Sequence, residues 1–166
     1  GTGTLSALAG YSQSNIVGPA YGARILLAKT EDISDETPAE EDNWIAAVEW
    51  AEERGADVIA SGLGYVDWYE FSDLDGMTTL ITAAAEMASA RGMVVVNQAG
   101  NERSNSWQHI IPPADGRTKP DLLALGSLVP VAFFNDVNLY SLADGSSFES
   151  AQVAGAVALM LEQNPR

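Results

Sequence analysis

The sequence of 166 residues contains no cysteine and a single histidine, His109. The lack of cysteine excludes a disulfide framework, a thiolate metal site and a cysteine nucleophile. Basic residues are also scarce: 8 Lys and Arg stand against 23 Asp and Glu, which gives a formal net charge of −15. Such an acidic chain argues against nucleic acid or an anionic membrane as a partner, because both carry negative charge.

Long apolar runs are missing too. The longest stretches, such as VAGAVALML, are far shorter than the roughly 20 residues that cross a bilayer. Residue 1 is Gly and no basic-then-apolar segment follows it, so we expect a processed product or a piece of a longer chain. The balance of 46% hydrophobic and 19% charged residues is that of a globular protein. We therefore predict one domain over residues 1–166.

Short apolar runs alternate with helical patterns along the chain. We predict buried strands at 23–30, 56–61 and 93–98, and further short strands at 121–126 and 128–134. Helices are predicted from Asp42 or Asn43 to Gly55, over 77–90 and over 150–163, the last apolar on most sides and therefore buried. This alternation predicts an α/β fold with a parallel sheet flanked by helices. In such sheets, chemistry gathers at the carboxyl ends of the strands.

Three segments rich in Gly, Ser and Asn lie at or near such ends: SGLGY at 61–65, AGNERSNSW at 99–107 and GSSFESAQ at 145–152. Ser147 stands just before the last predicted helix, where backbone N–H groups could hold an oxyanion while the hydroxyl attacks a carbonyl. From spacing alone, a serine at this place is more often a helix cap. Asn101 could donate its side-chain amide to the same oxyanion, or could simply form a turn after Gly100.

These segments resemble the subtilisin-like serine proteases, or subtilases. GSSFESAQVAG is similar to the nucleophile motif G-T-S-x-A-x-P-x-V-A-G with Ser147 at the serine, and VVVNQAGNE is similar to the oxyanion segment with Asn101 as the donor. Three further stretches, GTGTLSALAG, VGPAYGARILLAKT and GRTKPDLLALG, resemble family segments in the family's order. The resemblance implies a three-layer α/β/α fold, a secreted serine endopeptidase and a peptide or protein substrate. The implied substrate-binding residues are Ser61, Gly62, Leu63, Gly64, Ala99 and Gly100.

The chain also departs from the family pattern. Family catalysis uses Asp, His and Ser in that order, and this chain begins at the Gly that would follow the histidine. We therefore expect a domain truncated at its N-terminus, with the Asp and His upstream. It is also internally shortened, because IIPPADG runs straight into RTKPDL. Glu149 replaces an alanine of the serine motif and would oppose an oxyanion.

Since a serine without a base is a weak nucleophile, three readings stay open. The chain is part of a subtilase peptidase domain, or a degenerate relative that binds extended peptides without cleaving them. The third reading is a small esterase-like hydrolase in which another base, such as His109, serves Ser147.

We expect no cofactor and no metal. The acidic loop 31–42 lacks the alternating acids and central glycine of an EF-hand loop, and the DLDG stretch at 73–76 is a similarly weak cation signal. The loop is interpreted as a solvated charge run, with a bound calcium ion as the alternative. The DLDG stretch is interpreted as a helix cap. Oligomeric state is left open by the sequence.

Overall fold

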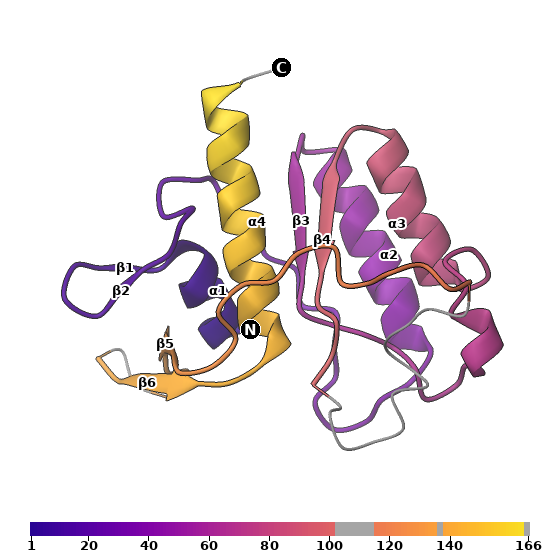
Figure 1. The fold of residues 1–166 in the computed structure, drawn as a ribbon, viewed down its shortest axis with the longest axis horizontal. Coiled ribbons are helices and arrows are strands. Elements are labelled where there is room, and N and C mark those ends of the chain that lie inside the picture. Colours follow the sequence, from indigo (N-terminus) through magenta and orange to yellow (C-terminus); the bar gives the residue numbers. More distant parts are fainter. Residues whose placement is uncertain (102–114, 136–137, 165–166) are drawn as a thin grey trace.

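The computed structural model describes residues 1–101, 115–135 and 138–164 (Figure 1). The elements are, in chain order, α1 (Thr2–Ala9), β1 (Tyr11–Ser12), β2 (Ile16–Val17), α2 (Ala39–Glu52), β3 (Val58–Ser61), the 3-10 helix η1 (Phe71–Asp73), α3 (Leu80–Ala90), β4 (Val94–Asn97), β5 (Val129–Ala132), β6 (Tyr140–Ala143) and α4 (Ser146–Gln163).

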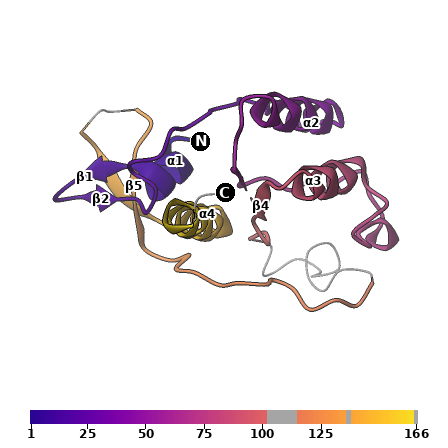
Figure 2. The same cartoon turned by 90° about the horizontal axis from the view of Figure 1, so that it is seen from above.

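The central pair of strands, β3 and β4, is parallel, with Val58 opposite Val94 and Ser61 opposite Asn97. Helices α2 and α3 lie on one side of this pair and α4 on the other (Figures 1 and 2). The predicted parallel strands flanked by helices are therefore confirmed. The two strands end together, and this places Ser61 and Asn97 at the same edge, where the candidate site lies.

The larger core fills the space between the strands and α2–α3. It holds one face of each helix together with the start of β4 and the segment after β3. Its buried members are Trp44, Val48, Tyr65, Ala84, Ala88 and Met93. Ile59 and Val95 pack against them from the strands. Burial of this apolar surface is the main term that fixes β3 and β4 relative to the helices.

A second, smaller core joins α4 to the N-terminal part of the chain. Its buried members are Ala7, Val129, Val131 and Ala151, from α1, β5 and α4. The antiparallel pair β5–β6 and the short hairpin β1–β2 lie on this side of α4 (Figure 1). Helix α4 thus stands between two packed groups of elements, and its first turn is held from both sides.

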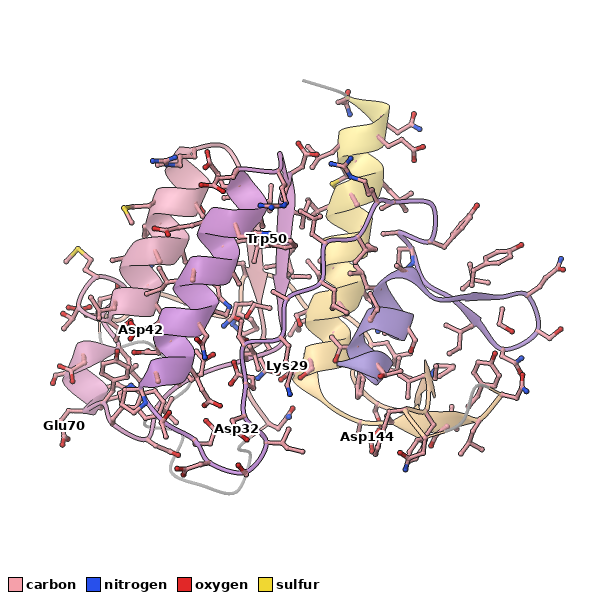
Figure 3. The ribbon with its side chains drawn as sticks, turned by 180° about the vertical axis from the view of Figure 1, so that it is seen from behind. Lys29, Asp32, Asp42, Trp50, Glu70 and Asp144 are labelled. Atoms are coloured by element: carbon pink, nitrogen blue, oxygen red, sulfur yellow. The ribbon has the colours of Figure 1, made fainter. Side chains whose placement is uncertain are left out.

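The predicted strand at 23–30 is not a strand. Among the described residues no neighbour forms a ladder with it, and Leu27 is 69% exposed. Figure 3 shows Lys29 near the end of this stretch; the chain then continues through Asp32 to α2, whose first turn contains Asp42. An apolar run with β-forming residues predicts a strand, but a strand also requires a hydrogen-bonding partner.

Other boundaries also differ from the prediction. Helix α2 begins at Ala39 rather than at Asp42 or Asn43, and α4 begins at Ser146 rather than at Ser150. The last turns of α4 are not buried, since Leu159 and Met160 are exposed. Residues 121–126 form no strand, whereas α1, β1, β2 and β6 were not predicted. None of the helices that the structure describes is both long enough and apolar enough to cross a membrane.

Candidate active site

Ser147 is the second residue of α4, in the first turn of the helix. Gly145 precedes the helix with φ at 152°, a value that residues other than glycine rarely adopt. This turn leads the chain from β6 into α4 and leaves Ser147 half-buried. Its hydroxyl is therefore not sealed in the core, and it stands where the helix dipole favours negative charge.

The Ser147 hydroxyl lies against the ends of both central strands. Its Oγ donates a hydrogen bond to Gln98 Oε1 at 2.6 Å and lies 3.4 Å from the carbonyl oxygen of Gly62. The approach to Gly62 is so close that an added Cβ there would stand 3.1 Å from the Ser147 Cβ. Glycine at position 62 is what allows α4 to meet the end of β3.

Asn101 lies beside the same helix turn. Its Oδ1 accepts a hydrogen bond from the Ser146 backbone N–H at 2.7 Å, and its amide atoms lie 3.7 Å from where a Cβ on Gly145 would stand. Gly100 makes this possible with φ at 91°, in the left-handed region that favours glycine. Because Oδ1 is engaged with Ser146, the Nδ2 end of the amide is the donor left for another group.

The predicted substrate-binding residues fall around Ser147 in different ways. Ser61 is buried, Leu63 packs on the larger core and Gly64 is exposed, with open space where a Cβ would stand. Ala99 lines a groove of about 500 Å³ between β4, α3, α4 and the 119–124 segment. The structure thus brings Gly62 and Asn101 to the turn that carries Ser147. Ser61 and Leu63 turn toward the helices on the other side.

Ser61 is held by a buried hydrogen bond. The Trp44 indole Nε1 donates to Ser61 Oγ at 3.1 Å, and both residues are less than a tenth exposed. The Gln98 backbone N–H then donates to the Ser61 carbonyl at 3.2 Å, which continues the ladder past β4. The floor of the candidate site is therefore tied to α2.

Glu149 does not face the Ser147 hydroxyl. Its carboxylate lies over Gly126, in the segment that precedes β5. One turn further along α4, Gln152 Nε2 donates to the Leu125 carbonyl at 2.7 Å. Gln152 thus ties the 121–126 segment to α4, and the Glu149 carboxylate lies against Gly126 of the same segment. The expected opposition of Glu149 to an oxyanion does not follow from this position.

The acidic loop is not uniformly solvated, contrary to the prediction. Glu40 and Glu41, at the start of α2, are each only 3% exposed. Glu40 accepts hydrogen bonds from the backbone N–H groups of Asp32 and Thr37, and Glu41 accepts one from the Tyr69 hydroxyl at 2.7 Å. The carboxylates organise the loop and the helix start, where the dipole favours negative charge.

Three carboxylates of this region, from Glu31, Glu36 and Glu40, have oxygens within 4.8 Å of one another. Loss of hydration and the negative charges of Glu40 and Glu31 raise the pKa of the Glu36 carboxyl. The Tyr65 hydroxyl donates to Glu31 at 2.6 Å, and burial together with this bond raises the pKa of Tyr65. Asp75, in the DLDG stretch, accepts hydrogen bonds from the backbone N–H groups of Met77 and Thr78. It does not cap α3, because the N-cap of that helix is Thr79, whose side chain accepts from the Thr82 N–H.

His109 lies outside the described residues, so its suggested role as a base stays a prediction. Gln98 is the residue of the site that the sequence patterns did not single out. An amide side chain at the end of an apolar strand carries no motif of its own, and its contact with Ser147 arises from the packing of α4 against β3–β4.

Comparison with known proteins identifies the family and supports the fold. The model of the Subtilase family, Peptidase_S8, matches residues 1–114, and the chain belongs to this family. Among individual relatives, the chain is 30% identical over 141 residues to subtilisin DY of Bacillus licheniformis, with 73% of this chain covered.

The solved structures of MycP1 share the fold. One, with its N-terminal propeptide removed, superposes with a TM-score of 0.67 at 19% identity and covers 99% of this chain and 67% of its own. Another, from Mycobacterium smegmatis, gives a TM-score of 0.65 at 17% identity and covers 98% of this chain and 58% of its own. The chain spans about half the length of subtilisin DY, at 48%.

Proposed function

We propose that this chain carries the serine side of a subtilase active site, with Ser147 as the nucleophile and Asn101 as the oxyanion donor. The observation that supports it most is the convergence of three parts on one helix turn: Ser147 in α4, Asn101 Oδ1 on the Ser146 N–H, and Gly62 against the Ser147 side chain. The substrate would be a peptide or protein bound along residues 61–64 and 99–100. The secretion expected from the family is part of this proposal.

The chemical step is attack of Ser147 Oγ on the scissile carbonyl carbon. A C–O bond forms, the C–N bond breaks, and the hydroxyl proton ends on the leaving amine. Asn101 Nδ2 would stabilise the negative oxygen, a kind of contribution that is large because the donor is already in place. The transfer of the proton requires a base.

Ser147 modification tests the nucleophile. A fluorophosphonate probe should label the folded chain at Ser147, located by peptide mass spectrometry, and Ser147→Ala should abolish the label. Ser150→Ala is the matched control, because Ser150 lies in the first turns of the same helix but is buried and donates to the Ser147 carbonyl. Label that survives Ser147→Ala would rule out this serine.

One observation favours a second candidate function, that of a subtilase relative that binds peptides without cleaving them. Within the described residues, the groups that accept from Ser147 Oγ are an amide and a backbone carbonyl oxygen, and neither is a base at neutral pH. Peptide turnover by the chain alone is then expected to be no more than about 10³–10⁴-fold over water, the residual known for subtilisins stripped of triad members. Extended peptides that bind Ser147→Ala and wild type equally, with no cleavage by wild type, would favour this candidate.

A further inference from the structure

Gln98 is placed by the strand to meet the first turn of α4. It directly follows β4, and its backbone N–H still bonds to the Ser61 carbonyl. Side chains alternate across a strand, and Val95 packs toward the α2–α3 core. Gln98 therefore points to the opposite side, where α4 lies, while Asn97 points away from α4.

The side-chain oxygen of Gln98 accepts hydrogen bonds from two serine hydroxyls. Ser147 Oγ lies 2.6 Å and Ser146 Oγ 3.2 Å from Gln98 Oε1. The bond to Ser147 is much shorter than that hydroxyl's other approach, 3.4 Å to the Gly62 carbonyl. The direction of the Ser147 O–H is thus set by Gln98, and the oxygen lone pairs point elsewhere.

An amide oxygen can hold this proton but cannot remove it, because a neutral amide is an acceptor and not a base at neutral pH. Attack by Ser147 needs the proton to leave as the new bond forms. Any base that serves Ser147 has to displace Gln98 as the acceptor before the proton can move.

We propose that Gln98 is a positioning residue that holds the Ser147 hydroxyl in its protonated form and restrains the nucleophile until a base takes over its proton. The inference rests on the proposed role of Ser147. According to this inference, Gln98, at the end of β4, slows the acylation of Ser147.

The first test removes the acceptor and keeps the length of the side chain. Gln98→Met should raise the rate of fluorophosphonate labelling at Ser147 by about 2- to 12-fold, the range that corresponds to the net worth of one hydrogen bond. In this reaction the Oγ–P bond forms, the P–F bond breaks, fluoride leaves and the hydroxyl proton goes to solvent. An unchanged or lower labelling rate in folded Gln98→Met would show that Gln98 does not restrain Ser147.

The second test turns the acceptor into a base at the same position. Gln98→Glu places a carboxylate oxygen where Oε1 lies, so the hydroxyl proton now passes to that carboxylate as fluoride leaves. General-base assistance of this kind contributes about 10²–10⁴-fold. The labelling rate of Gln98→Glu should rise with pH as the carboxylate ionises and then level off, a step that wild type lacks. A merely structural role for Gln98 would not produce this pH profile.

Asn97→Asp is the matched charge control, because it adds a carboxylate one residue away on the other side of the strand. Its labelling should match wild type, and thermal unfolding checks that every variant is folded. Equal Ser147 labelling in wild type, Gln98→Met and Gln98→Glu would overturn the inference and leave the proposed function standing. No label at Ser147 in any folded variant would instead reject the nucleophile, and both proposals with it.

Discussion

The side-chain oxygen of Asn101 accepts a hydrogen bond from the backbone N–H of Ser146, at 2.7 Å. This N–H is one of the free donors at the start of α4, so Asn101 caps the helix through its side-chain oxygen. Its Nδ2 is the donor that we propose for the oxyanion. The two ends of one amide thereby have separate tasks, one in stability and one in the proposed chemistry.

Asn101→Asp separates these two tasks. The carboxylate keeps an acceptor for the Ser146 N–H and adds a negative charge at a helix N-terminus, so stability should be kept or raised by about 0.3–1 kcal/mol. The Nδ2 donor is lost, and labelling of Ser147 should fall by about 10²–10³-fold, a magnitude established on a subtilisin and carried over to this relative. Thermal unfolding and labelling rates check the two parts.

Asn101→Ala is the companion variant, because it removes both ends of the amide. It should lose labelling to a similar degree and also lose about 0.5–1.5 kcal/mol of stability with the hydrogen bond. Labelling of Asn101→Asp at the wild-type rate would show that Asn101 does not serve the oxyanion.

Ser61→Ala should destabilise the protein because it leaves the buried Trp44 Nε1 without its partner. An unsatisfied buried donor costs about 1–3 kcal/mol, and urea unfolding measures the change. Ser141→Ala on β6 is the control, since Ser141 is exposed and the same substitution there should stay within about 0.5 kcal/mol. Equal effects of the two changes would mean that the hydrogen bond from the Trp44 indole to Ser61 contributes little to the free energy of unfolding.

The two central strands could be predicted from the sequence because apolar runs bounded by glycine or polar residues mark them. Residues 56–61 and 93–98 contain β3 and β4, and their parallel pairing follows from the helix between them. The run at 23–30 has the same pattern but no ladder among the described residues. A local sequence pattern shows that a segment can form a strand, but it does not show whether another strand is available to pair with it. One domain over 1–166 stays a prediction.

The candidate site was predictable where a motif carries it and not where packing makes it. Ser147 and Asn101 were found through their segments, although their roles stay predictions. The sequence predicts the start of α4 at Ser150, four residues too late, because Ser146 and Ser147 are typical of residues before a helix. In the structure, Gly145 and Asn101 allow the helix to begin at Ser146. Gln98 reaches Ser147 through the contact of α4 with β4, which no local pattern records.

Gly155→Ala tests how closely α4 approaches the N-terminal part of the chain. In a free helix, alanine would add about 0.5–1 kcal/mol of stability over glycine. Here a Cβ at position 155 would stand 2.8 Å from the Pro19 Cβ, and overpacking of this kind costs about 1–3 kcal/mol. We expect a net loss of about 1–2 kcal/mol by urea unfolding. The loss should shrink when Gly155→Ala is made in a Pro19→Gly background, and a stabilising Gly155→Ala would contradict the close approach.

Glu36→Gln tests the repulsion among the carboxylates at the start of α2. The pKa of Glu36 is raised in the folded protein, by lost hydration first and by Glu40 and Glu31 next. The folded state therefore binds this proton more readily than the unfolded state, so the ionised group destabilises the fold above its pKa and the penalty disappears as the pH falls through it. Glu36 is exposed, and solvent screening limits the gain from Glu36→Gln at pH 7 to a few tenths of a kcal/mol. The gain should be largest at low salt and vanish near pH 3, as measured by thermal unfolding against pH. Glu162→Gln, at the far end of α4 and outside this group, is the control for the removal of one charge, and an equal pH-dependent gain there would assign the effect to net charge alone.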